Sequence, residues 1–275
     1  MGTIHFVKFH KVGVHLKLDP NLSTVKKTFS IITATYNEVE NIEHWFEVVI
    51  TALTSTNYLR LESIIVVDDG STDGTKEKIK DIKKIYKQLD IKLVERYSKM
   101  GTLDAQIAGA KHSNSDYLLL LDADLQHDPS YIPIFVGYLS RNYDIVIGSR
   151  YLEKQKQEWG FFRSLVSKTA IVISKCLIKQ ARPYTDPLSG YFAIRRDLLT
   201  DLPPFRGGYK PLLYSLASHN NIKVKEIPIK MNKRLLGESK IVNMNFIFLA
   251  KFLREIILIN MEGKSIRRRQ EGQTL

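Results

Sequence analysis

Cysteine is almost absent from this sequence, with Cys176 as the one thiol in 275 residues. A lone cysteine cannot form an intrachain disulfide, and it cannot build a zinc site from several thiolates. Both classes of cysteine-stabilised protein are therefore excluded. This cysteine usage is typical of proteins in a reducing compartment, so we expect the chain to face the cytoplasm.

Long apolar runs are missing as well. The longest apolar stretch, residues 245–260, contains Lys251, Arg254 and Glu255 and is shorter than the roughly 20 residues of a spanning helix. Phe6 occupies the place where a myristoylation signal has Ser or Thr. Basic residues interrupt the segment where a secretory signal needs an apolar core: Lys8, His10, Lys11, His15 and Lys17. We expect no signal peptide and no transmembrane helix.

Acidic residues are in deficit, since 41 Lys and Arg residues oppose 29 Asp and Glu residues, a net charge of +12. Such an excess suits a polyanionic partner, whether nucleic acid, an anionic membrane surface or a phosphorylated substrate. Internal repeats and low-complexity segments are lacking too. The length and the 44% hydrophobic content are sufficient for one catalytic α/β domain with a sizeable core.

Short apolar runs separated by charged, helix-like segments dominate the chain from residue 29 onward. We expect strands at 29–35, 63–67, 91–95, 117–121 and 145–147, and helices at 75–89 and 102–112. Ser71 and Asp73 offer capping side chains ahead of the first helix. This alternation predicts a mostly parallel sheet, and in such sheets ligands bind beyond the carboxyl ends of the strands.

The remaining segments are less regular. We expect a helix at 161–180, a stretch punctuated by Gly and Pro at 182–209, a strand at 223–229 and a last helix at 244–259. Residues 1–28 alternate apolar and polar side chains, which indicates an added edge strand or a loose arm. The predicted organisation is an extension (1–28), a catalytic domain (29–240), an amphipathic helix (241–262) and a disordered basic tail (263–275).

Polar motifs follow the first two predicted strands. The first strand ends in Thr35-Tyr36-Asn37-Glu38, and the second ends in Asp68-Asp69-Gly70-Ser71-Thr72-Asp73-Gly74. Carboxylates at strand ends can accept hydrogen bonds from a nucleotide base and ribose, and the glycines allow tight turns beside them. Either motif alone is typical of an ordinary turn. The two together favour a nucleotide site.

A third motif is the most informative, because four apolar residues, 118–121, end abruptly in Asp122-Ala123-Asp124-Leu125-Gln126. Paired carboxylates after a buried strand repel each other unless a cation binds them. Mg²⁺ or Mn²⁺, shared with the diphosphate of a ligand, would offset this repulsion. The alternative is a solvated turn, with Asp128-Pro129 beginning the next helix.

In this order, the three motifs resemble family 2 glycosyltransferases, which have the GT-A fold: a Rossmann-like, mostly parallel sheet flanked by helices. Four later segments resemble the dolichyl-phosphate mannose synthase branch of that family: Gly148-Ser149-Arg150-Tyr151, Trp159 with Arg163, Asp186-Pro187-Leu188-Ser189-Gly190-Tyr191 and Arg234-Leu235-Leu236-Gly237-Glu238-Ser239-Lys240. The resemblance covers about residues 29 to 260. Ala34 departs from it, since members often have Pro there.

The resemblance implies roles for individual residues. It assigns donor binding to Thr35, Tyr36, Glu38, Asp68, Asp69, Gly101, Asp122 and Ala123. It assigns the metal to Asp122, Asp124 and Gln126. It assigns the acceptor phosphate or the donor diphosphate to Arg150, Arg163, Ser167, Arg234 and Lys240. The residues expected to act in catalysis are Asp124, Arg150, Arg163 and Asp186. Arg is suited to the phosphate roles because its fork matches phosphate oxygens.

Membrane attachment is expected to come from amphipathic helices or from a membrane-anchoring partner subunit, because the multi-helix membrane domain of some members is not seen after residue 240. In an unbroken helix at 161–180, Lys168, Lys175 and Lys179 would project within about 40° of one another beside a broad apolar face. Residues 245–259 are similarly amphipathic. Two core helices are the alternative, and the resemblance favours helices at the membrane interface, with C-terminal interfacial helices completing the fold.

The predicted reaction moves a hexose from a nucleotide sugar to a polyprenyl or dolichyl phosphate, with metal assistance and inversion. The resemblance favours mannose from GDP-mannose. A phosphate monoester is largely dianionic at neutral pH and needs no general base. Alternatives are a family 2 enzyme that uses UDP-glucose or a glycan hydroxyl, with Asp186 as the candidate base, and a non-catalytic sugar-nucleotide-binding partner. A nucleic-acid-binding protein is disfavoured, because the distinctive polar residues are carboxylates.

Overall fold

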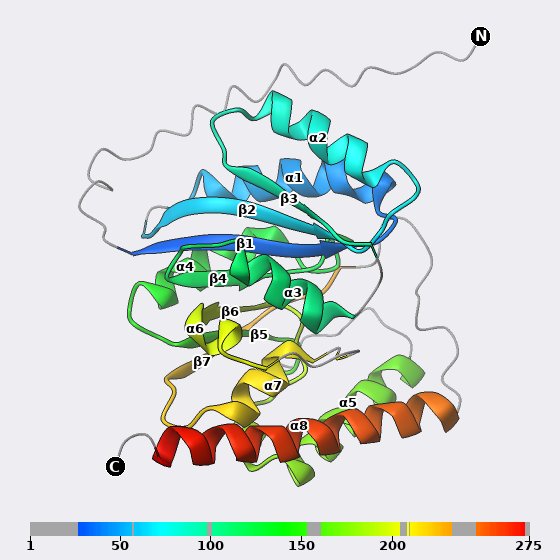
Figure 1. Ribbon diagram of the computed structural model, residues 1–275, viewed down its shortest axis with the longest axis vertical. Helices are drawn as coiled ribbons and strands as arrows, with labels where there is room; N and C mark the ends of the chain where they lie inside the picture. The colour runs from blue at the N-terminus through cyan, green and yellow to red at the C-terminus, as the bar shows by residue number, and fades with distance from the viewer. Residues whose placement is uncertain are drawn as a thin grey trace.

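The computed structural model describes residues 27–56, 58–97, 101–152, 161–203, 208, 210–232 and 246–272, with the backbone alone for 161–163 and 246–249. The expected strand or arm at residues 1–28 lies almost wholly outside the described residues. Seven strands of the described chain form one sheet (Figure 1). Their order across the sheet is β3, β2, β1, β4, β6, β5, β7.

The strands are β1 (Thr28–Thr35), β2 (Arg60–Asp68), β3 (Ile91–Glu95), β4 (Tyr117–Leu120), β5 (Ile145–Ser149), β6 (Phe192–Arg195) and β7 (Val224–Pro228). All neighbouring pairs are parallel except those of β6, which runs antiparallel to β4 and to β5. The predicted mostly parallel sheet is confirmed. The expected strands are confirmed with small shifts at their ends, whereas β6 lies inside the stretch for which we expected no strand.

The helices cover both faces of the sheet. They are α1 (Val39–Leu53), α2 (Thr75–Ile85), α3 (Thr102–Lys111), α4 (Ile132–Leu139), α5 (Phe161–Leu177), α6 (Asp197–Thr200), α7 (Pro211–Ser218) and α8 (Phe246–Gly272). Short 3₁₀ segments are η3 (Pro129–Tyr131) and η4 (Lys179–Ala181). Helices α1, α2 and α4 share one apolar core, and the other core includes α3, α6 and α7 (Figure 1).

The two cores arise from side chains that alternate along the strands. In β1, Ile31 belongs to the core beneath α1, while its neighbour Ile32 belongs to the core beneath α3. Leu119 and Leu120 of β4 divide in the same way. A strand buried on both faces reads as a continuous apolar run, which explains the short runs in the sequence. Because the strands that carry the polar motifs are parallel, those motifs all meet at one edge of the sheet.

Helices α5 and α8 lie side by side as an outer layer over α7 (Figure 1). Helix α8 approaches α7 closely, since a Cβ at Gly263 would lie 2.5 Å from the carbonyl oxygen of Ala217. The Tyr214 hydroxyl also donates to Glu262 at 2.6 Å. Within the described residues, no helix is both long enough and apolar enough to cross a membrane.

Two expectations for this layer are corrected. Residues 263–272, expected as a disordered tail, continue α8, because Gly263 and Ile266 pack into the protein. The helix expected at 161–180 ends at Leu177, so Lys179 lies in η4 and the three lysines share no single helical stripe. Ile178 is extended and buried there, and the side chain of Arg182 donates to the Lys175 carbonyl oxygen at 3.0 Å, which satisfies an acceptor of the last turn.

Candidate active site

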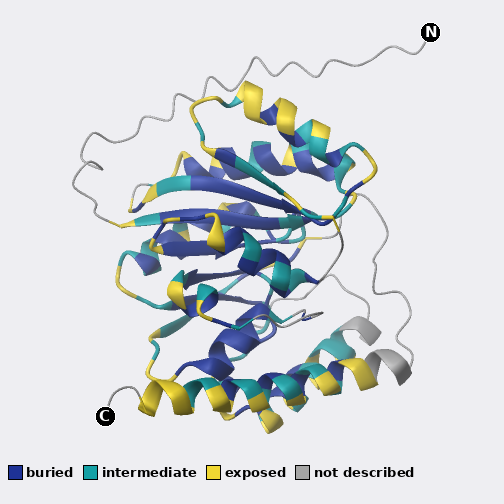
Figure 2. Cartoon of the chain, in the orientation of Figure 1, coloured by how far each residue is buried: buried dark blue, intermediate teal, exposed yellow. Residues whose placement is uncertain are grey.

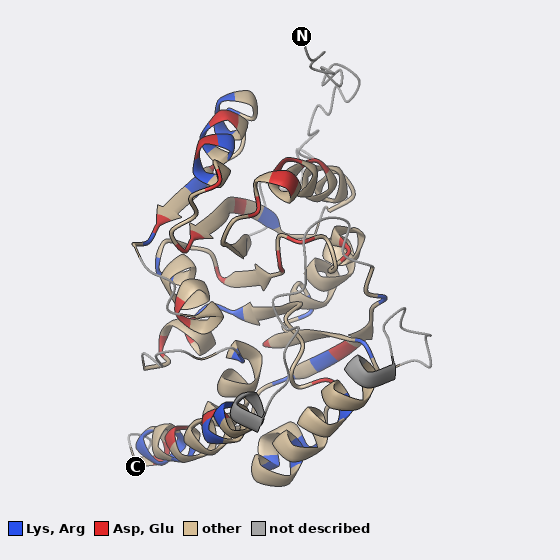
Figure 3. Ribbon diagram, turned by 90° about the vertical axis from the view of Figure 1, so that its right-hand side faces the viewer, with Lys and Arg blue, Asp and Glu red and all other residues tan. Residues whose placement is uncertain are grey.

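The sequence motifs converge where strands β1, β2, β4 and β5 end. Figure 3 views the molecule from the side toward which β1 and β2 point. Residues 186–190 reach the same edge by a different route. They precede β6, and Phe192 at its start pairs with Leu120 at the end of β4, because β6 is antiparallel. Segments more than 150 residues apart thus form one polar site.

The turns after β1 and β2 are joined by direct hydrogen bonds. The side-chain oxygen of Asn37 accepts a hydrogen bond from the Thr72 amide at 3.0 Å, and the backbone amide of Asn37 donates to the Ser71 hydroxyl at 2.9 Å. The amide of Glu38 donates to the Thr75 hydroxyl at 2.9 Å. The N-cap of α2 is Gly74, and Asp73 before it accepts from the amide of Thr75 at 3.0 Å, as expected of a capping side chain. Ser71, also expected to cap α2, instead bonds to Asn37 and Asp68. The two motifs form one rigid surface.

Asp68 lies beneath this surface. Its carboxylate is fully buried and accepts from the hydroxyls of Thr35 at 3.1 Å and Ser71 at 2.5 Å, and from the amides of Gly70 and Ser71. The structure thus shows Asp68 and Thr35 holding the turn. Tyr36 and Glu38 are partly exposed above it. Direct contact of these residues with a nucleotide stays a prediction.

Asp69 forms an ion pair that the sequence did not suggest. Its Oδ1 lies 3.4 Å from Nε of Arg96, the residue after β3, and both side chains are largely buried. The backbone of Arg96 also lies close to Gly70, whose φ of +84° is the left-handed conformation that favours glycine. A guanidinium therefore stands beside the expected donor residues. Only the pairing of β3 with β2 brings it there.

The turn after β4 presents its two carboxylates toward the site. The side chain of Asp122 is 48% exposed and that of Asp124 is partly exposed, whereas Ala123 and Leu125 are buried. The Trp45 indole donates to the Asp122 carbonyl oxygen at 3.0 Å, and Asp124 accepts from the amide of Gln126 at 3.1 Å. The backbone is therefore held from below, and the carboxylates remain accessible.

A divalent cation fits this donor set. Within the described chain no three His, Cys, Asp or Glu side chains converge on one point, so the protein offers two carboxylates and Gln126. Mg²⁺ is commonly bound by one or two carboxylates together with substrate phosphates. The partly exposed carboxylates of Asp122 and Asp124 meet that requirement, and the ligand would supply the other oxygens.

His127 supports the same turn from inside. Burial lowers its pKa to about 4, although the nearby Asp124 opposes this shift. The imidazole is therefore neutral at pH 7, and its Nδ1 accepts from the Asp122 amide at 3.3 Å. Asp122 Oδ2 lies 3.5 Å from Nδ1, and with a neutral ring this contact is no ion pair. His127 also packs against Tyr191, which precedes β6.

Arg150 and Asp186 form a buried, bidentate ion pair. Nε and Nη2 of Arg150 donate to the two oxygens of Asp186 at 2.6 and 2.7 Å, and the Arg150 amide adds a third bond at 3.2 Å. Burial opposes the charge on Arg150, but the attraction and hydrogen bonds of Asp186 outweigh it, so the pKa of Arg150 is raised. Asp186 is 0% exposed.

Glu226 on β7 fixes the segment that carries Asp186. Its carboxylate accepts from the amide and hydroxyl of Thr185 at 2.9 Å and from the Asp186 amide at 3.1 Å. Further along, a Cβ at Gly190 would lie 3.1 Å from His127 and 3.5 Å from Asp122, so only a very small residue fits between this segment and the carboxylates. The Asp186 segment and the Asp122 turn therefore touch.

Lys210 is a further charged residue that sequence reasoning missed. It directly precedes α7, where Pro211 begins the helix, and the nearby Gly208 accepts a hydrogen bond from Leu103 at the start of α3. Burial, then the charge of Arg150, lowers the pKa of Lys210, while Glu255, Asp186 and Asp122 raise it. Lys210 is therefore coupled electrostatically to Arg150, Asp186 and Asp122 of the site. A Lys-Pro pair at a helix start was the available signal.

Other predicted residues are placed less fully. Gly101 precedes α3 with a φ of +106°, and Ser167 lies partly buried on α5. Arg163 lies in α5, where the structure describes only its backbone. Arg234 and Lys240 lie outside the described residues. The structure thus brings together the predicted donor residues other than Gly101, the predicted metal residues, Arg150 and Asp186, and the roles of all of them stay predictions.

Comparison with known proteins agrees with this architecture. The sequence profile of glycosyl transferase family 2 matches residues 30–202, and the chain belongs to that family. Among solved structures it is similar to glucosyl-3-phosphoglycerate synthase from Mycobacterium tuberculosis, with a TM-score of 0.62, 21% identity, and 88% and 81% of the two chains covered. A structure of that enzyme with Mn²⁺, UDP-glucose and phosphoglyceric acid gives the same values. At this identity the likeness shows the fold.

Two curated relatives share the name dolichol-phosphate mannosyltransferase. The protein from Pyrococcus furiosus is 36% identical over 237 residues, which cover 86% of this chain and 64% of that protein. The protein from Saccharomyces cerevisiae is 26% identical over 251 residues, with 86% of this chain and 90% of that protein covered. The chain therefore spans less than two thirds of the archaeal relative.

Proposed function

We propose that this protein transfers mannose from GDP-mannose to the phosphate of a polyprenol such as dolichol. The observation that carries the proposal is the state of Asp186. Both of its oxygens accept bonds from Arg150 in a buried pair, so this carboxylate is poorly suited to take a proton from a sugar hydroxyl. An acceptor phosphate brings its own negatively charged oxygen and requires no base.

The names of the curated relatives support mannose and dolichyl phosphate as the substrates. One of the similar solved structures, of glucosyl-3-phosphoglycerate synthase, contains UDP-glucose and phosphoglyceric acid. A UDP-glucose donor is therefore the second candidate. The hydroxyl acceptor is less well supported because of the Arg150–Asp186 pair.

In the proposed mechanism, the joined turns after β1 and β2 would hold the nucleoside, and Asp122 and Asp124 would hold Mg²⁺ or Mn²⁺ near the donor diphosphate. A cation there would supply positive charge to the departing nucleoside diphosphate. Arg150 is oriented by Asp186 and presents its charge near the same turn, where it would stabilise phosphate oxygens. The acceptor oxygen would attack the anomeric carbon opposite the leaving group, with inversion.

The layer of α5 and α8 is the proposed membrane-facing side, with the protein on the cytoplasmic face. Large apolar side chains point outward from both helices: Leu165 is 50% exposed, Val172 58%, Ile257 48% and Met261 61%. Figures 2 and 3 show that exposed and basic residues run along these helices. Apolar side chains flanked by cations suit a helix lying in the headgroup layer. A membrane-anchoring partner subunit would add to this attachment.

The test is transfer of label by the purified protein. It is incubated with radiolabelled GDP-mannose, UDP-glucose or other nucleotide sugars, with Mg²⁺ or Mn²⁺, and with a short polyprenyl phosphate. We expect label from GDP-mannose to enter the organic phase and EDTA to prevent it. Transfer of label from UDP-glucose alone would identify UDP-glucose as the donor in place of GDP-mannose. Transfer only to a glycan hydroxyl would refute the proposed acceptor.

A further inference from the structure

The exposed side of α8 forms one continuous stripe along the helix. Arg254, Ile257, Met261, Lys264 and Arg268 are all exposed and follow one another at three- or four-residue spacing, which places them on one face of a helix. The opposite face, with Phe252, Ile256, Ile259 and Gly263, is buried against the protein. The stripe is therefore apolar in its middle and cationic at both ends.

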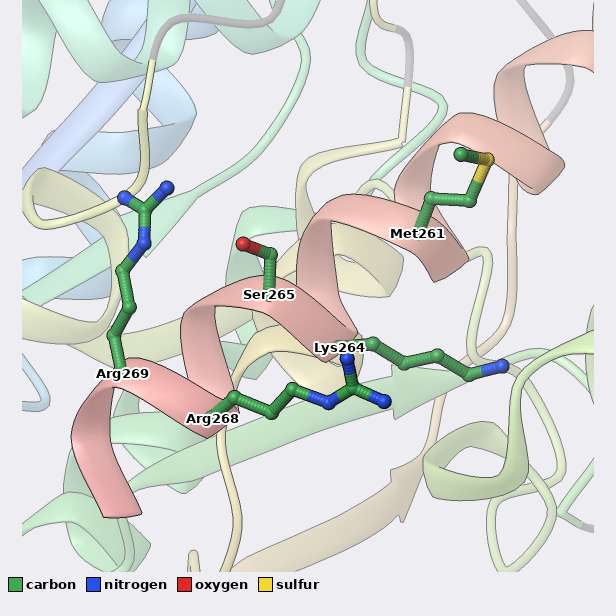
Figure 4. A pocket seen from close by; sticks show the side chains of 5 residues that line it. All are labelled: Met261, Lys264, Ser265, Arg268 and Arg269. Carbon is green, nitrogen blue, oxygen red and sulfur yellow. The ribbon is translucent and has the colours of Figure 1, made fainter. Parts of the chain in front are cut away.

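The C-terminal end of the stripe surrounds an open hollow of about 420 Å³. Met261, Lys264, Ser265, Arg268 and Arg269 line it (Figure 4). In Figure 4 the side chains of Lys264 and Arg268 extend on the same side of the helix, one turn apart, whereas Arg269 extends away from them. The hollow thus has two neighbouring cations and an apolar thioether side chain in its lining, whereas Ser265 extends away from Lys264 and Arg268 (Figure 4).

Internal partners do not account for these cations. Among the described residues, none of the ion pairs involves Lys264, Arg268 or Arg269. Arg268 and Arg269 lie in the last turn of α8, where cations stabilise the helix dipole. Lys264 lies two turns before the end, beyond the range of that effect. A cation there, beside exposed Met261, requires another explanation.

We propose that the Lys264–Arg268 hollow binds the phosphate headgroup of an anionic phospholipid, with Met261 and Ile257 meeting the upper acyl chains. Two neighbouring cations match phosphate oxygens. The adjoining exposed apolar residues favour a lipid over nucleic acid, which offers no apolar layer on that side. The proposal rests on the membrane-facing role given to α5 and α8 under the proposed function. It adds a defined headgroup site at the C-terminal end of α8, away from the candidate active site where the strands end (the strand-end site).

The test measures binding of the full chain to phosphatidylcholine vesicles with graded phosphatidylglycerol content. Lys264→Gln/Arg268→Gln removes the hollow's charge. Lys251→Gln/Arg254→Gln is the matched control, because it removes the same charge from exposed positions on the same helix. One cation near an anionic membrane contributes about a five-fold factor in binding, so diffuse attraction alone predicts a loss of roughly thirty-fold for either variant. Contact with a defined headgroup should make the loss in the hollow variant larger than this and larger than the loss in the control.

The charge-retaining variant Lys264→Arg/Arg268→Lys should bind like the parent, and neutral vesicles should not distinguish the proteins. Equal losses in the hollow and control variants would overturn the proposal, since diffuse attraction would then suffice. The proposal would also be overturned if inorganic phosphate at millimolar concentration released the parent from the vesicles, because the hollow would then bind any free phosphate ion. Binding of a short DNA duplex through Lys264 and Arg268 as tight as binding to the vesicles would overturn it as well.

A separate activity measurement keeps this inference distinct from the proposed function. With a short, water-soluble polyprenyl phosphate and no vesicles, the hollow variant should transfer label at the parent rate, because Lys264 and Arg268 are no part of the strand-end site. If the vesicle results are as expected but neither the parent nor the variants transfer label, the proposed function alone is refuted. If the hollow variant transfers label and binds vesicles as tightly as the parent, the headgroup site alone is refuted.

Discussion

Replacing Asp186 by Asn is expected to destabilise the protein strongly. The amide is nearly isosteric, but it removes the charge that compensates Arg150, whose side chain is 14% exposed and bonded to both oxygens of Asp186. Removing one partner of a buried pair costs about 3–5 kcal/mol, because the other charge is left uncompensated. For a domain of this size each kcal/mol lowers Tm by about 2–4 °C, so we expect a decrease of roughly 10 °C.

Thermal unfolding followed by circular dichroism, with urea unfolding as a second measure, tests this expectation. Asp201→Asn is the matched control, because the same change is made at an exposed position and should leave Tm within about 2 °C. The double variant Arg150→Met/Asp186→Asn should lose less stability than the two single losses added together, since it leaves no buried charge. Parental stability of Asp186→Asn, or strict additivity of the cycle, would refute the view that the pair acts as a unit.

Three further outcomes are expected. Asp124→Ala should abolish metal-dependent donor binding in calorimetry while leaving Tm nearly unchanged, because it removes a partly exposed ligand; full donor binding with EDTA present would contradict the metal site. Lys210→Met should lower kcat/KM about five-fold at parental Tm, since it removes a unit charge that interacts with Asp186 and Asp122, and such a charge is worth about 1 kcal/mol. An unaltered kcat/KM would remove Lys210 from the site. Gly263→Val should lower Tm by several degrees, because the new side chain meets the Ala217 carbonyl oxygen 2.5 Å away; Gly272→Val, in open space, is its control.

Local patterns were sufficient for the parallel half of the sheet. Runs such as 118–121 are buried on both faces, so their continuous apolar character is visible without any knowledge of the fold. The carboxylates that follow them are conspicuous for the same reason, because charge begins abruptly where burial ends. The shared edge then follows from parallel strands, which explains why Asp122 and Asp124 could be expected beside the turns at Thr35 and Asp68.

The donor half of the site also depends on short-range chemistry. Asn37 and Ser71 are ordinary turn residues, and the pairing of their strands brings the two turns into hydrogen-bonding distance. The sequence could not reveal that the carboxylate of Asp68 would be buried and would accept hydrogen bonds from this network. Burial of a carboxylate depends on which donors surround it, and those donors come from another strand.

The other half of the site was decided by tertiary structure. Strand β6 has four residues, too few for a periodic signal, and its antiparallel insertion between β4 and β5 is what brings Asp186 to Arg150 and Gly190 to Asp122. The roles of His127 and Lys210 likewise depend on contacts between segments distant in the chain.

The sequence by itself therefore determined the parallel strands, their common polar edge and the family, since each depends on composition and order within a few neighbouring residues. The tertiary structure alone decided which charges are paired, which are buried and which face of α8 is exposed. Desolvation and ion pairing depend on distances across the fold. Those distances are set by packing of elements such as α8 on α7, where Gly263 meets Ala217, and no local pattern in the sequence encodes them.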